Sequence, residues 1–346
     1  MILEPIPVTV LTGFLGSGKT TIIKRLLRDP DFTDTAIIVN EFGEVGLDHV
    51  LLEAADEVIV DLSCGCICCT IRGDLVSTLN DLYERRSSGE LPFFRRVVVE
   101  TTGLADPAPI IHTLMQEPLI FEHFRLARVV TAVDAVNGLK TLDLQPEAIK
   151  QVAVADALLV TKTDIANDTD TVAALPKVLK KINPSVETRN CVQGEIDPRF
   201  FFAGGLYDPG EKSFEVKNWF RQEATPRDHA HNADVNRHGA GIHTFTLSYT
   251  DPVSRGALGV FIQMLADQKG DDLLRLKGLV LLTDYPDRPA VIHGVQHVIH
   301  PIRRLDGWPV GIAETRIVLV VRNINKVWVQ NLWDQVLDSS YADLIV

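Results

Sequence analysis

The sequence predicts an α/β protein in which helices cover a parallel sheet, followed by a smaller α+β domain. From residue 7 to about residue 200, short β-branched segments alternate with segments of helical periodicity. Such alternation builds a parallel sheet with helices on both faces, because each crossover connection returns over the sheet. From residue 242 the order becomes strand, helix, three strands and a final helix, which predicts a separate α+β domain.

The predicted elements of the first domain follow the hydrophobic periodicity. The expected strands are 7–12, 36–40, 57–62, 95–100, 126–134, 156–161 and 186–190, and the expected helices are 19–28, 74–86, 108–116, 144–153 and 170–182. Residues 221–241 then break the pattern, because they are polar and contain few large apolar side chains, as a linker does. We therefore expect three parts, 1–220, 221–241 and 242–346.

Composition excludes several classes of protein. The chain has 346 residues, of which 46% are hydrophobic, and this is enough to bury the cores of two domains. Its net charge of −12 argues against nucleic acid or an anionic membrane as a partner. No apolar run is long enough for a membrane helix, and the apolar start lacks the basic flank of a signal peptide. We therefore expect a cytoplasmic protein.

Residues 13–20 read GFLGSGKT, which matches the phosphate-binding motif G-x-x-x-x-G-K-[ST]. A β-branched segment precedes the motif and a helical segment follows it, as a P-loop requires. Glycines let the backbone wrap around phosphates, while the helix N-terminus directs N–H groups at them. Lys19 would reach the β- and γ-phosphates, and the Thr20 hydroxyl would bind Mg²⁺. The other expected nucleotide-binding residues here are Gly13, Gly16, Ser17, Gly18 and Thr21.

A second acidic group is needed on the Mg²⁺ side of a P-loop site. The stretch RRVVVETTGLADP, 95–107, supplies Glu100 at the end of a predicted strand. Glutamate is longer than the usual aspartate, so we expect contact with the metal through water. Gly103 suits a loop that moves with the γ-phosphate. Lys19, Thr20 and Glu100 are therefore the expected catalytic groups.

The stretch TKTD, 161–164, follows another predicted strand and indicates guanine recognition. The Asp164 carboxylate can accept hydrogen bonds from guanine N1–H and the 2-amino group, which adenine does not offer. Lys162 can lay its aliphatic stem over the base. Thr161 stands where Asn is the commoner residue of such loops. The later stretch QGEID, 193–197, could close over the base with backbone groups.

Four of the five cysteines lie between residues 64 and 69, in SCGCICC. A disulfide framework is not expected in a chain of this length without an export signal. Cys66 and Cys69 have C-x-x-C spacing, so redox chemistry stays open. Metal binding fits better, because Cys66, Cys68 and Cys69 offer three soft donors in what we expect to be a Gly-flanked loop. Thiolates of this kind select zinc, Cu(I) or other late transition metals.

A short loop rarely supplies four ligands, so a further metal ligand is expected from elsewhere. The stretch IIVNEFGEVGLDH, 37–49, is the natural donor, since it follows a strand where the first switch loop of a P-loop GTPase is expected. Glu41 or Glu44 could reach the thiolates. If Glu41 binds metal while its loop senses the γ-phosphate, metal affinity and nucleotide state become linked.

Other polar residues receive structural interpretations. The linker histidines are His229, His231 and His238. They could bind metal weakly, or they could belong to a solvated connection. His293 and His297 share one face of a predicted strand, 290–300, while His300 lies on the other, so a shared metal site is not expected. We interpret His112 as a half-buried helix residue and Asp134, at a strand end, as a packing or capping residue.

The motifs GFLGSGKTT, VNEFGEVGLD, GCICCTIRGDL, VVVETTGLADPAP, TKTD and QGEID, in that order, closely resemble the CobW-type family of metallochaperone GTPases. The resemblance covers almost the whole chain. It implies hydrolysis of GTP to GDP and phosphate, with Lys19, Thr20, Glu100 and Asp164 handling GTP and Mg²⁺. It further implies that Glu41, Cys66, Cys68 and Cys69 bind Zn²⁺, or Co²⁺, for delivery to a client metalloprotein.

Two departures from the family pattern qualify this resemblance. The linker is poor in histidine, which weakens any storage role for it, and Cys64 stands where many members have Asn or Ser. The hypothesis is GTP-gated metal transfer to a client. Two alternatives stay open: a regulatory GTPase with only structural zinc, and an activator dedicated to one metalloenzyme, such as nitrile hydratase or a cobalamin-pathway enzyme. The oligomeric state and the water-activating residue are left open.

Overall fold

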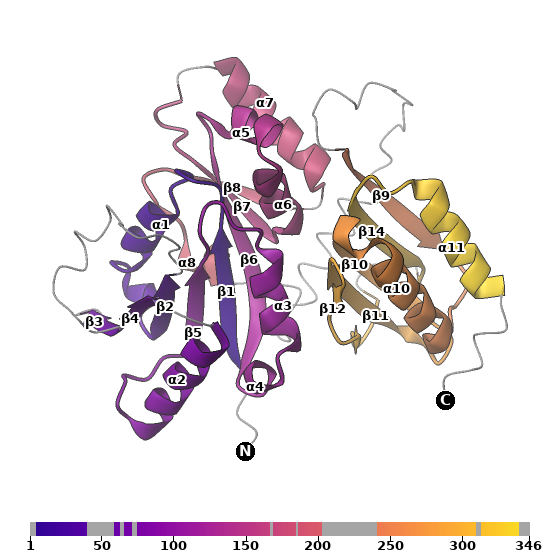
Figure 1. The fold of residues 1–346 in the computed structure, drawn as a ribbon, viewed down its shortest axis with the longest axis horizontal. Helices are drawn as coiled ribbons and strands as arrows, with labels where there is room; N and C mark the ends of the chain where they lie inside the picture. The colour runs from indigo at the N-terminus through magenta and orange to yellow at the C-terminus, as the bar shows by residue number, and fades with distance from the viewer. Residues whose placement is uncertain are drawn as a thin grey trace. The chain divides into compact units, whose positions relative to one another are not determined.

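The computed structural model describes residues 5–39, 59–62, 66–70, 75–166, 169–184, 186–202, 241–308 and 313–338, with only the backbone described at 59–62, 66–70 and 169–171. The chain divides into two compact units. The first unit consists of Met1–Val178 with Val186–Glu211, and the second of Leu179–Ser185 with Lys212–Val346. Figure 1 colours both units by residue number.

The first unit alternates strands and helices along the chain. Its strands are β1 (Ile6–Thr12), β2 (Thr35–Val39), β3 (Ile59–Leu62), β4 (Cys66–Thr70), β5 (Arg96–Glu100), β6 (Phe124–Asp134), β7 (Ala157–Thr161) and β8 (Glu187–Cys191). Its helices are α1 (Lys19–Leu26), α2 (Leu75–Ser88), α3 (Ala108–Gln116), α4 (Pro118–Phe121), α5 (Gly138–Leu144), α6 (Pro146–Val154), α7 (Thr169–Ile182) and α8 (Pro198–Phe202), and the end of α7 from Leu179 belongs to the second unit.

These strands form one sheet in the order β3-β4-β2-β5-β1-β6-β7-β8. All neighbouring pairs are parallel except β3 and β4, which are antiparallel. Leu11, Ile37 and Val130 pack with α1 and α8 on one face of the sheet. The other face meets α6, since the Thr131 hydroxyl donates a hydrogen bond to the Gln151 carbonyl at 2.8 Å. Figure 1 shows the two layers of helices with the sheet between them.

The predicted fold class is confirmed, and two local predictions are wrong. We expected a loop at the cysteines, but Cys66–Thr70 forms strand β4, which pairs with both β2 and β3. Cysteine behaves as a small hydrophobe, so the run CICC suits a strand flanked by two others. Gly138–Leu144 forms helix α5, whereas we expected a helix only from 144.

The second unit is an antiparallel sheet with helices. Its elements are β9 (Ile242–Tyr249), α10 (Arg255–Lys269), β10 (Leu273–Leu282), β11 (Tyr285–Val295), β12 (Val298–Ile299), β13 (Arg303–Arg304), β14 (Thr315–Arg322) and α11 (Lys326–Asp338). The sheet order is β12-β11-β10-β14-β9, and β13 pairs with β11. Phe261 of α10 and Trp333 of α11 pack edge to face over this sheet, with ring centroids 4.7 Å apart.

The predicted strand at 290–300 is also different in the structure. The chain turns at Gln296, which has a φ of 53°, so β11 and β12 form a hairpin instead of one straight strand. His293 and His300 therefore come together, with ring centroids 6.4 Å apart, while His297 points to Asp271. Among the described residues, no helix combines the length and apolarity needed to span a bilayer.

Candidate functional site

The glycine-rich loop between β1 and α1 has the backbone shape of a phosphate cradle. Gly13, Gly16 and Gly18 have φ values of 139°, 73° and 92°, which side-chain-bearing residues rarely adopt. A Cβ at Gly13 would collide with the Ala132 carbonyl, so the loop needs glycine there to lie against β6. Gly18 is the N-cap of α1, and Lys19, Thr20 and Thr21 form the first helical turn. The first N–H groups of a helix have no partner within the helix, so they are available to bind an anion.

Lys19 is held inside this loop. Its Nζ donates a hydrogen bond to the Gly13 carbonyl at 2.8 Å, and only 7% of the residue is exposed. Burial lowers the pKa of the Lys19 ammonium, and the charge of Glu100 opposes that shift in part. A buried cation enclosed by carbonyl groups is poised to meet phosphate oxygens. The geometry therefore fits a triphosphate, as the motif predicts.

Glu100 ends β5 next to the P-loop strand. It pairs in register with Leu11 of β1 and is 7% exposed. The following residue, Thr101, donates its backbone N–H to the Leu11 carbonyl at 2.9 Å and its hydroxyl to Thr12 Oγ1 at 2.8 Å. Glu100 is thus held near enough to Lys19 to affect its charge, at the strand end where an acid on the Mg²⁺ side is expected.

Gly103 brings the loop after β5 into contact with the P-loop. A Cβ at this position would lie 2.6 Å from Leu15 N and 2.7 Å from Leu15 Cα. No side chain fits there without movement of the backbone. A displacement of the loop toward the P-loop at Gly103 would therefore push against Leu15. Such contact is expected of a loop that responds to the γ-phosphate.

The TKTD loop is tied to the P-loop by two polar contacts. Thr161 Oγ1 donates a hydrogen bond to the Ser17 carbonyl at 2.7 Å. Lys162 has a φ of 59°, and its Nζ lies 2.9 Å from Asp134 Oδ2. Burial by itself raises the pKa of Asp134, but hydrogen bonds from Lys162, Asn137 and Val136 outweigh it and lower that pKa. Asp134 therefore both caps the turn before α5 and fixes the Lys162 side chain.

Asp164 ends the TKTD loop, and the loop after β8 is a further segment of the site. Asp164 is exposed just beyond β7, where it is free to meet a base at the surface. The loop after β8 reaches α1 through Gly194, whose φ is 79° and where a Cβ would lie 2.7 Å from the Thr21 carbonyl. Arg25 and Glu195 form an exposed ion pair at 2.9 Å between the same two segments. Cys191 itself is fully buried in the core next to α1, as interpreted from the sequence.

The proposed metal ligands fall in a different part of the sheet. Cys66, Cys68 and Cys69 belong to β4, in which Cys68 pairs with Ile37 and Cys69 with Ile38 of β2. The side chains of β4 are not among the described atoms, and Glu41, Glu44 and Cys64 lie outside the described residues. The linker histidines also lie outside them. Elsewhere in the described residues, no group of three or more His, Cys, Asp or Glu side chains could hold a metal.

Some residues near the site have roles that sequence reasoning missed. Gln151 and Lys150 of α6 both contact the loop after β5, through hydrogen bonds to Gly103 and Ala105 and an ion pair with Asp106. Their only sequence signal was a polar pair in an otherwise apolar helix. His112 is half-buried on α3, where the periodicity places it.

The fold and the site together define a P-loop nucleotide-binding protein with a separate antiparallel domain. The nucleotide-binding domain of the CobW/HypB/UreG family matches residues 7–190, and the cobalamin synthesis protein cobW C-terminal domain matches residues 242–337. The chain therefore belongs to the CobW family, as the motifs of its sequence indicate.

Named relatives of known sequence include zinc chaperones and a zinc-regulated GTPase. The zinc chaperone YjiA of Escherichia coli strain K12 is 32% identical over 296 residues, which cover 86% of this chain and 88% of the relative. Zinc-regulated GTPase metalloprotein activator 1 of Schizosaccharomyces pombe is 26% identical, with 94% of this chain and 84% of the relative covered. GTPase metallochaperones are thus the class of protein to which this chain is related.

A solved structure supports the same relation. The crystal structure of Zn(II)-bound YjiA GTPase from E. coli aligns with a TM-score of 0.76 at 28% identity, covering 97% of this chain and 100% of the other. A Zn(II)-bound triple mutant of YjiA, in which one glutamate and two cysteines are replaced by alanine, aligns with a TM-score of 0.74 at 27% identity, covering 96% and 99% of the two chains. Both units of the fold are therefore shared with a GTPase that binds zinc.

Proposed function

We propose that this protein is a GTP-hydrolysing metallochaperone that binds zinc, or cobalt, at the cysteines of β4 and delivers it to a client protein. The observation that carries the proposal is the strand order β4-β2-β5-β1. One strand, β2, separates the cysteines of β4 from Glu100 of β5. Since neighbouring strands lie about 4.8 Å apart, β4 and β5 are about 10 Å apart.

On the nucleotide side, the residues of this chain bind and orient GTP. The P-loop N–H groups and Lys19 hold the phosphates, while Asp164 and Lys162 select guanine. Thr20 and Glu100 would hold Mg²⁺, which neutralises charge on the phosphate oxygens when bound. Catalysis at such a site consists mainly of positioning and charge stabilisation, so the fixed contacts of Lys19 and Thr101 favour it.

On the metal side, Cys66, Cys68 and Cys69 supply thiolates and Glu41 a carboxylate. Thiolate ligands favour zinc and cobalt over Mg²⁺, which keeps the two metals at separate sites. A set drawn from one strand and a separate segment of the sequence can be opened by moving that segment. Such a site suits transfer better than permanent storage, and the names of the zinc chaperone relatives agree with it.

Coupling between the two sites runs through β2. Val39, the last residue of β2, pairs in register with Thr70 of β4 on one side and Glu100 of β5 on the other. Glu41 follows two residues later. A nucleotide-dependent change at the end of β2 would therefore act on the metal ligand and the Mg²⁺-side acid together. We assign residues 1–220 to this GTPase domain, 221–241 to a linker, and 242–346 to a domain that takes part in client docking.

The test is a competitive Zn²⁺ titration of the full chain with a non-hydrolysable GTP analogue and with GDP. Gating predicts that the two zinc affinities differ by about tenfold, a usual size for coupling between two sites. Equal zinc affinities with the two nucleotides would refute the gating. Because the triple mutant of the relative was also crystallised with Zn(II), the readout must be the affinity of the tightest site rather than the presence of zinc.

The variant Cys66→Ser/Cys68→Ser/Cys69→Ser separates transfer from a structural role. As a chaperone, this variant stays folded and hydrolyses GTP but no longer loads an apo client. With a structural zinc, it loses unfolding free energy instead, and chelation of the wild-type chain does the same. The matched control is Cys191→Ala, which removes a thiol far along the sequence from β4 and should leave zinc affinity unchanged.

A second candidate is an activator of one metalloenzyme, favoured by the name of the S. pombe relative, a zinc-regulated GTPase metalloprotein activator. Such an activator would raise the activity of a single apo-enzyme, and it would do so only with GTP present. A chaperone of broader use would load several unrelated apo-proteins at similar rates. Measuring zinc transfer to a panel of purified apo-enzymes distinguishes the two.

A further inference from the structure

Helix α6 holds the loop that connects β5 to α3. Gln151 Nε2 donates hydrogen bonds to the carbonyls of Gly103 at 3.2 Å and of Ala105 at 3.0 Å. Lys150 Nζ lies 2.7 Å from Asp106 Oδ2. Two consecutive helix residues therefore contact three residues of one short loop segment, through two backbone carbonyls and one carboxylate.

These contacts are largely shielded from water. Gln151 is 1% exposed, and the side chains of Lys150 and Asp106 are 22% and 26% exposed. A hydrogen bond in such surroundings is stronger than one in water. The Asp106 carboxylate also accepts a hydrogen bond from the N–H of Ala108 at 3.0 Å, at the start of α3. The far end of the loop is therefore restrained by both α6 and α3.

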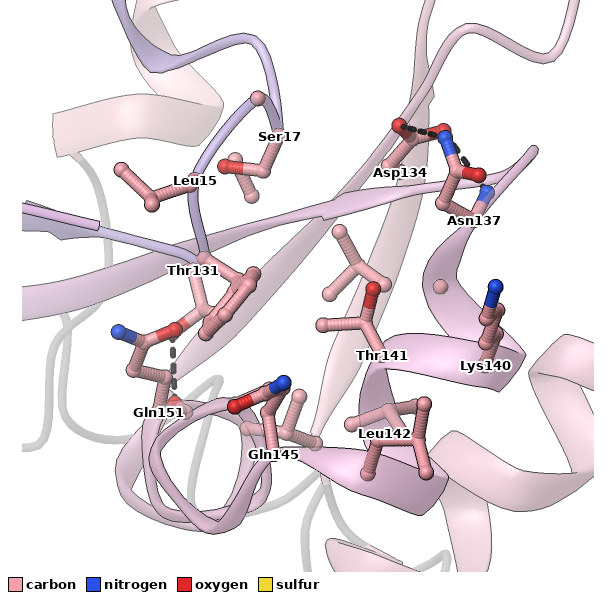
Figure 2. Close-up of a pocket in the computed structure, with 18 of the residues that line it drawn as sticks. Leu15, Ser17, Thr131, Asp134, Asn137, Lys140, Thr141, Leu142, Gln145 and Gln151 are labelled. Carbon is pink, nitrogen blue, oxygen red and sulfur yellow. Dashed lines mark hydrogen bonds between the residues drawn. The ribbon is translucent and has the colours of Figure 1, made fainter. Parts of the chain in front are cut away.

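Helix α6 is itself tied to the strand that leads into the P-loop. The Gln151 carbonyl accepts a hydrogen bond at 2.8 Å from the hydroxyl of Thr131 on β6, which Figure 2 shows. Thr131 pairs in register with Thr12, the last residue of β1. Thr12 Oγ1 in turn accepts a hydrogen bond at 2.8 Å from Thr101, the first residue after β5. The contacts thus form a closed circuit from β1 through β6, α6 and the loop back to β1.

The bonds from Gln151 also determine which way the loop peptides face. None of the described peptide bonds is cis, and in a trans peptide the C=O and the following N–H point in opposite directions. Because the carbonyls of Gly103 and Ala105 are turned toward α6, the N–H groups of Leu104 and Asp106 are turned away from it. The orientation of two backbone donors in this loop therefore depends on one side chain.

The position of this loop matters because it meets the P-loop. A Cβ at Gly103 would lie 2.6 Å from Leu15 N, so the two backbones are in close contact. Catalysis of phosphoryl transfer depends on the placement of charges and donors around the phosphate, and a misplacement of about 1 Å can cost about 10²-fold in rate. Whatever holds the loop against the P-loop therefore has influence on the rate.

We propose that Gln151 and Lys150 are positioning residues for GTP hydrolysis. They act through the loop after β5, which they hold against the P-loop with its backbone donors turned away from α6. This is the arrangement in which the chain hydrolyses GTP. The inference rests on the proposed function, because it requires the chain to be a GTPase.

The first experiment removes the two donors of Gln151. Gln151→Met keeps the length of the side chain but cannot donate a hydrogen bond. We expect the rate of single-turnover hydrolysis at saturating GTP to fall about tenfold, because the loop is no longer held in place. Equilibrium affinity for fluorescent GDP should change less than about twofold, since the phosphate cradle keeps its own contacts. An unchanged or higher rate, or an equal loss of GDP affinity, would overturn the proposal.

A matched control separates positioning from packing. Thr131→Val removes the hydrogen bond to the Gln151 carbonyl and leaves both side-chain bonds to the loop in place. This variant should unfold at a lower urea concentration than the wild-type chain, because a buried carbonyl loses its partner. Its hydrolysis rate should stay within about twofold of the wild-type rate. A loss of rate as large as in Gln151→Met would mean that α6 contributes only stability, and would overturn the proposal.

The ion pair gives a second test at a position that is less buried. Lys150→Met should lower the hydrolysis rate about threefold, as expected for a partly exposed ion pair. Lys150→Arg keeps the positive charge and should restore most of the rate. Lys177→Met on α7, which removes an exposed lysine, should leave the rate unchanged. Equal rates in Lys150→Met and the wild-type chain, or the same loss in Lys177→Met, would contradict the role of Lys150.

The same measurements distinguish this inference from the proposed function. A wild-type chain that does not hydrolyse GTP would contradict the proposed function itself. A wild-type chain that hydrolyses GTP no faster than Gln151→Met and Lys150→Met would contradict the positioning role alone.

Discussion

The sheet of the first unit is built differently on its two sides. On the side of β1, β6 and β7, the loops that end the strands are tied to one another by side chains, such as Thr161 to Ser17 and Lys162 to Asp134. On the side of β2, β4 and β3, the cysteines owe their place to backbone register, in which Cys68 pairs with Ile37 and with Val60. Among the described atoms, the nucleotide side shows side-chain contacts between its loops in addition to strand pairing, and the cysteine side is described by its strand pairing.

In the proposed function, this difference allows nucleotide binding and zinc binding to be linked and yet to be changed separately. Each side-chain contact between the loops of the nucleotide side can be removed by a single substitution. Such substitutions should change nucleotide binding and leave the pairing of the cysteine strand unchanged. A shift of β2 would instead act on both sides, because β2 pairs with β4 and β5. The following expectations test the comparison, from the largest effect to the smallest.

Lys19→Ala should have the largest effect. It removes the buried ammonium that bonds the Gly13 carbonyl at 2.8 Å, so GTP hydrolysis should fall about 10²–10³-fold, as on loss of one phosphate-directed donor. Zinc affinity without nucleotide should not change. Single-turnover hydrolysis and a zinc titration measure the two effects, with Lys24→Ala on the same helix as the control. A matching loss of zinc affinity would break the separation of the two sides.

Gly103→Ala should come next. The added Cβ would meet Leu15 N at 2.6 Å, so the loop or the P-loop must move, and a displacement of this kind costs up to about 10²-fold in rate. GDP affinity should change much less than the rate. Gly259→Ala is the control, since nothing lies within 4 Å of its Cβ on helix α10. That control should stabilise the chain by about 0.5–1 kcal/mol, as Ala replaces Gly in a helix. Unchanged hydrolysis in Gly103→Ala would remove the loop from the mechanism.

Asp134→Asn should weaken GTP and GDP equally, by about tenfold. The change removes the charge that holds Lys162 at 2.9 Å, and a hydrogen bond between charged groups contributes about 1.5–3 kcal/mol. Equilibrium binding of fluorescent GTP and GDP measures it, with Asp143→Asn, an exposed acid of α5, as the control. A selective loss of GTP would mean that Asp134 acts on the γ-phosphate rather than on the base side.

The smallest functional effect is expected at Cys191. Burial raises the pKa of the Cys191 thiol from 9.0 to about 11, so at pH 8 it should react with iodoacetamide about a hundredfold more slowly than an ordinary thiol. Because the folded pKa is raised, the associated stability is full below about pH 9 and is lost as the pH rises through about 11. Peptide mass spectrometry after timed alkylation measures the rate. Fast labelling of Cys191 would contradict its place in the core.

The comparison also explains which features the sequence could predict. The P-loop, Glu100 and the TKTD loop were predictable because a local motif at a strand end determines each. Strand β4 was not, because its formation depends on pairing with β2 and β3, and the glycines around CICC indicated a loop. Gln151 looked like an ordinary polar helix residue until its bonds to Gly103 and Ala105 were known. The hairpin that brings His293 near His300 was not predictable, because its turn needs a left-handed backbone at Gln296. Glycine is the usual sequence signal for that conformation, and position 296 is not a glycine.

Strand β3 has a consequence for the behaviour of the protein in solution. Among the described strands, β3 ends the sheet beside β4 and is only four residues long. A short outer strand offers little template for pairing with another molecule, so β3 keeps the thiol-bearing strand away from the edge. Removing residues 59–62 would turn β4 into an edge strand carrying three cysteines, and two molecules could then pair there and cross-link by oxidation. The antiparallel strand β3 thus covers the edge of the strand that carries Cys66, Cys68 and Cys69.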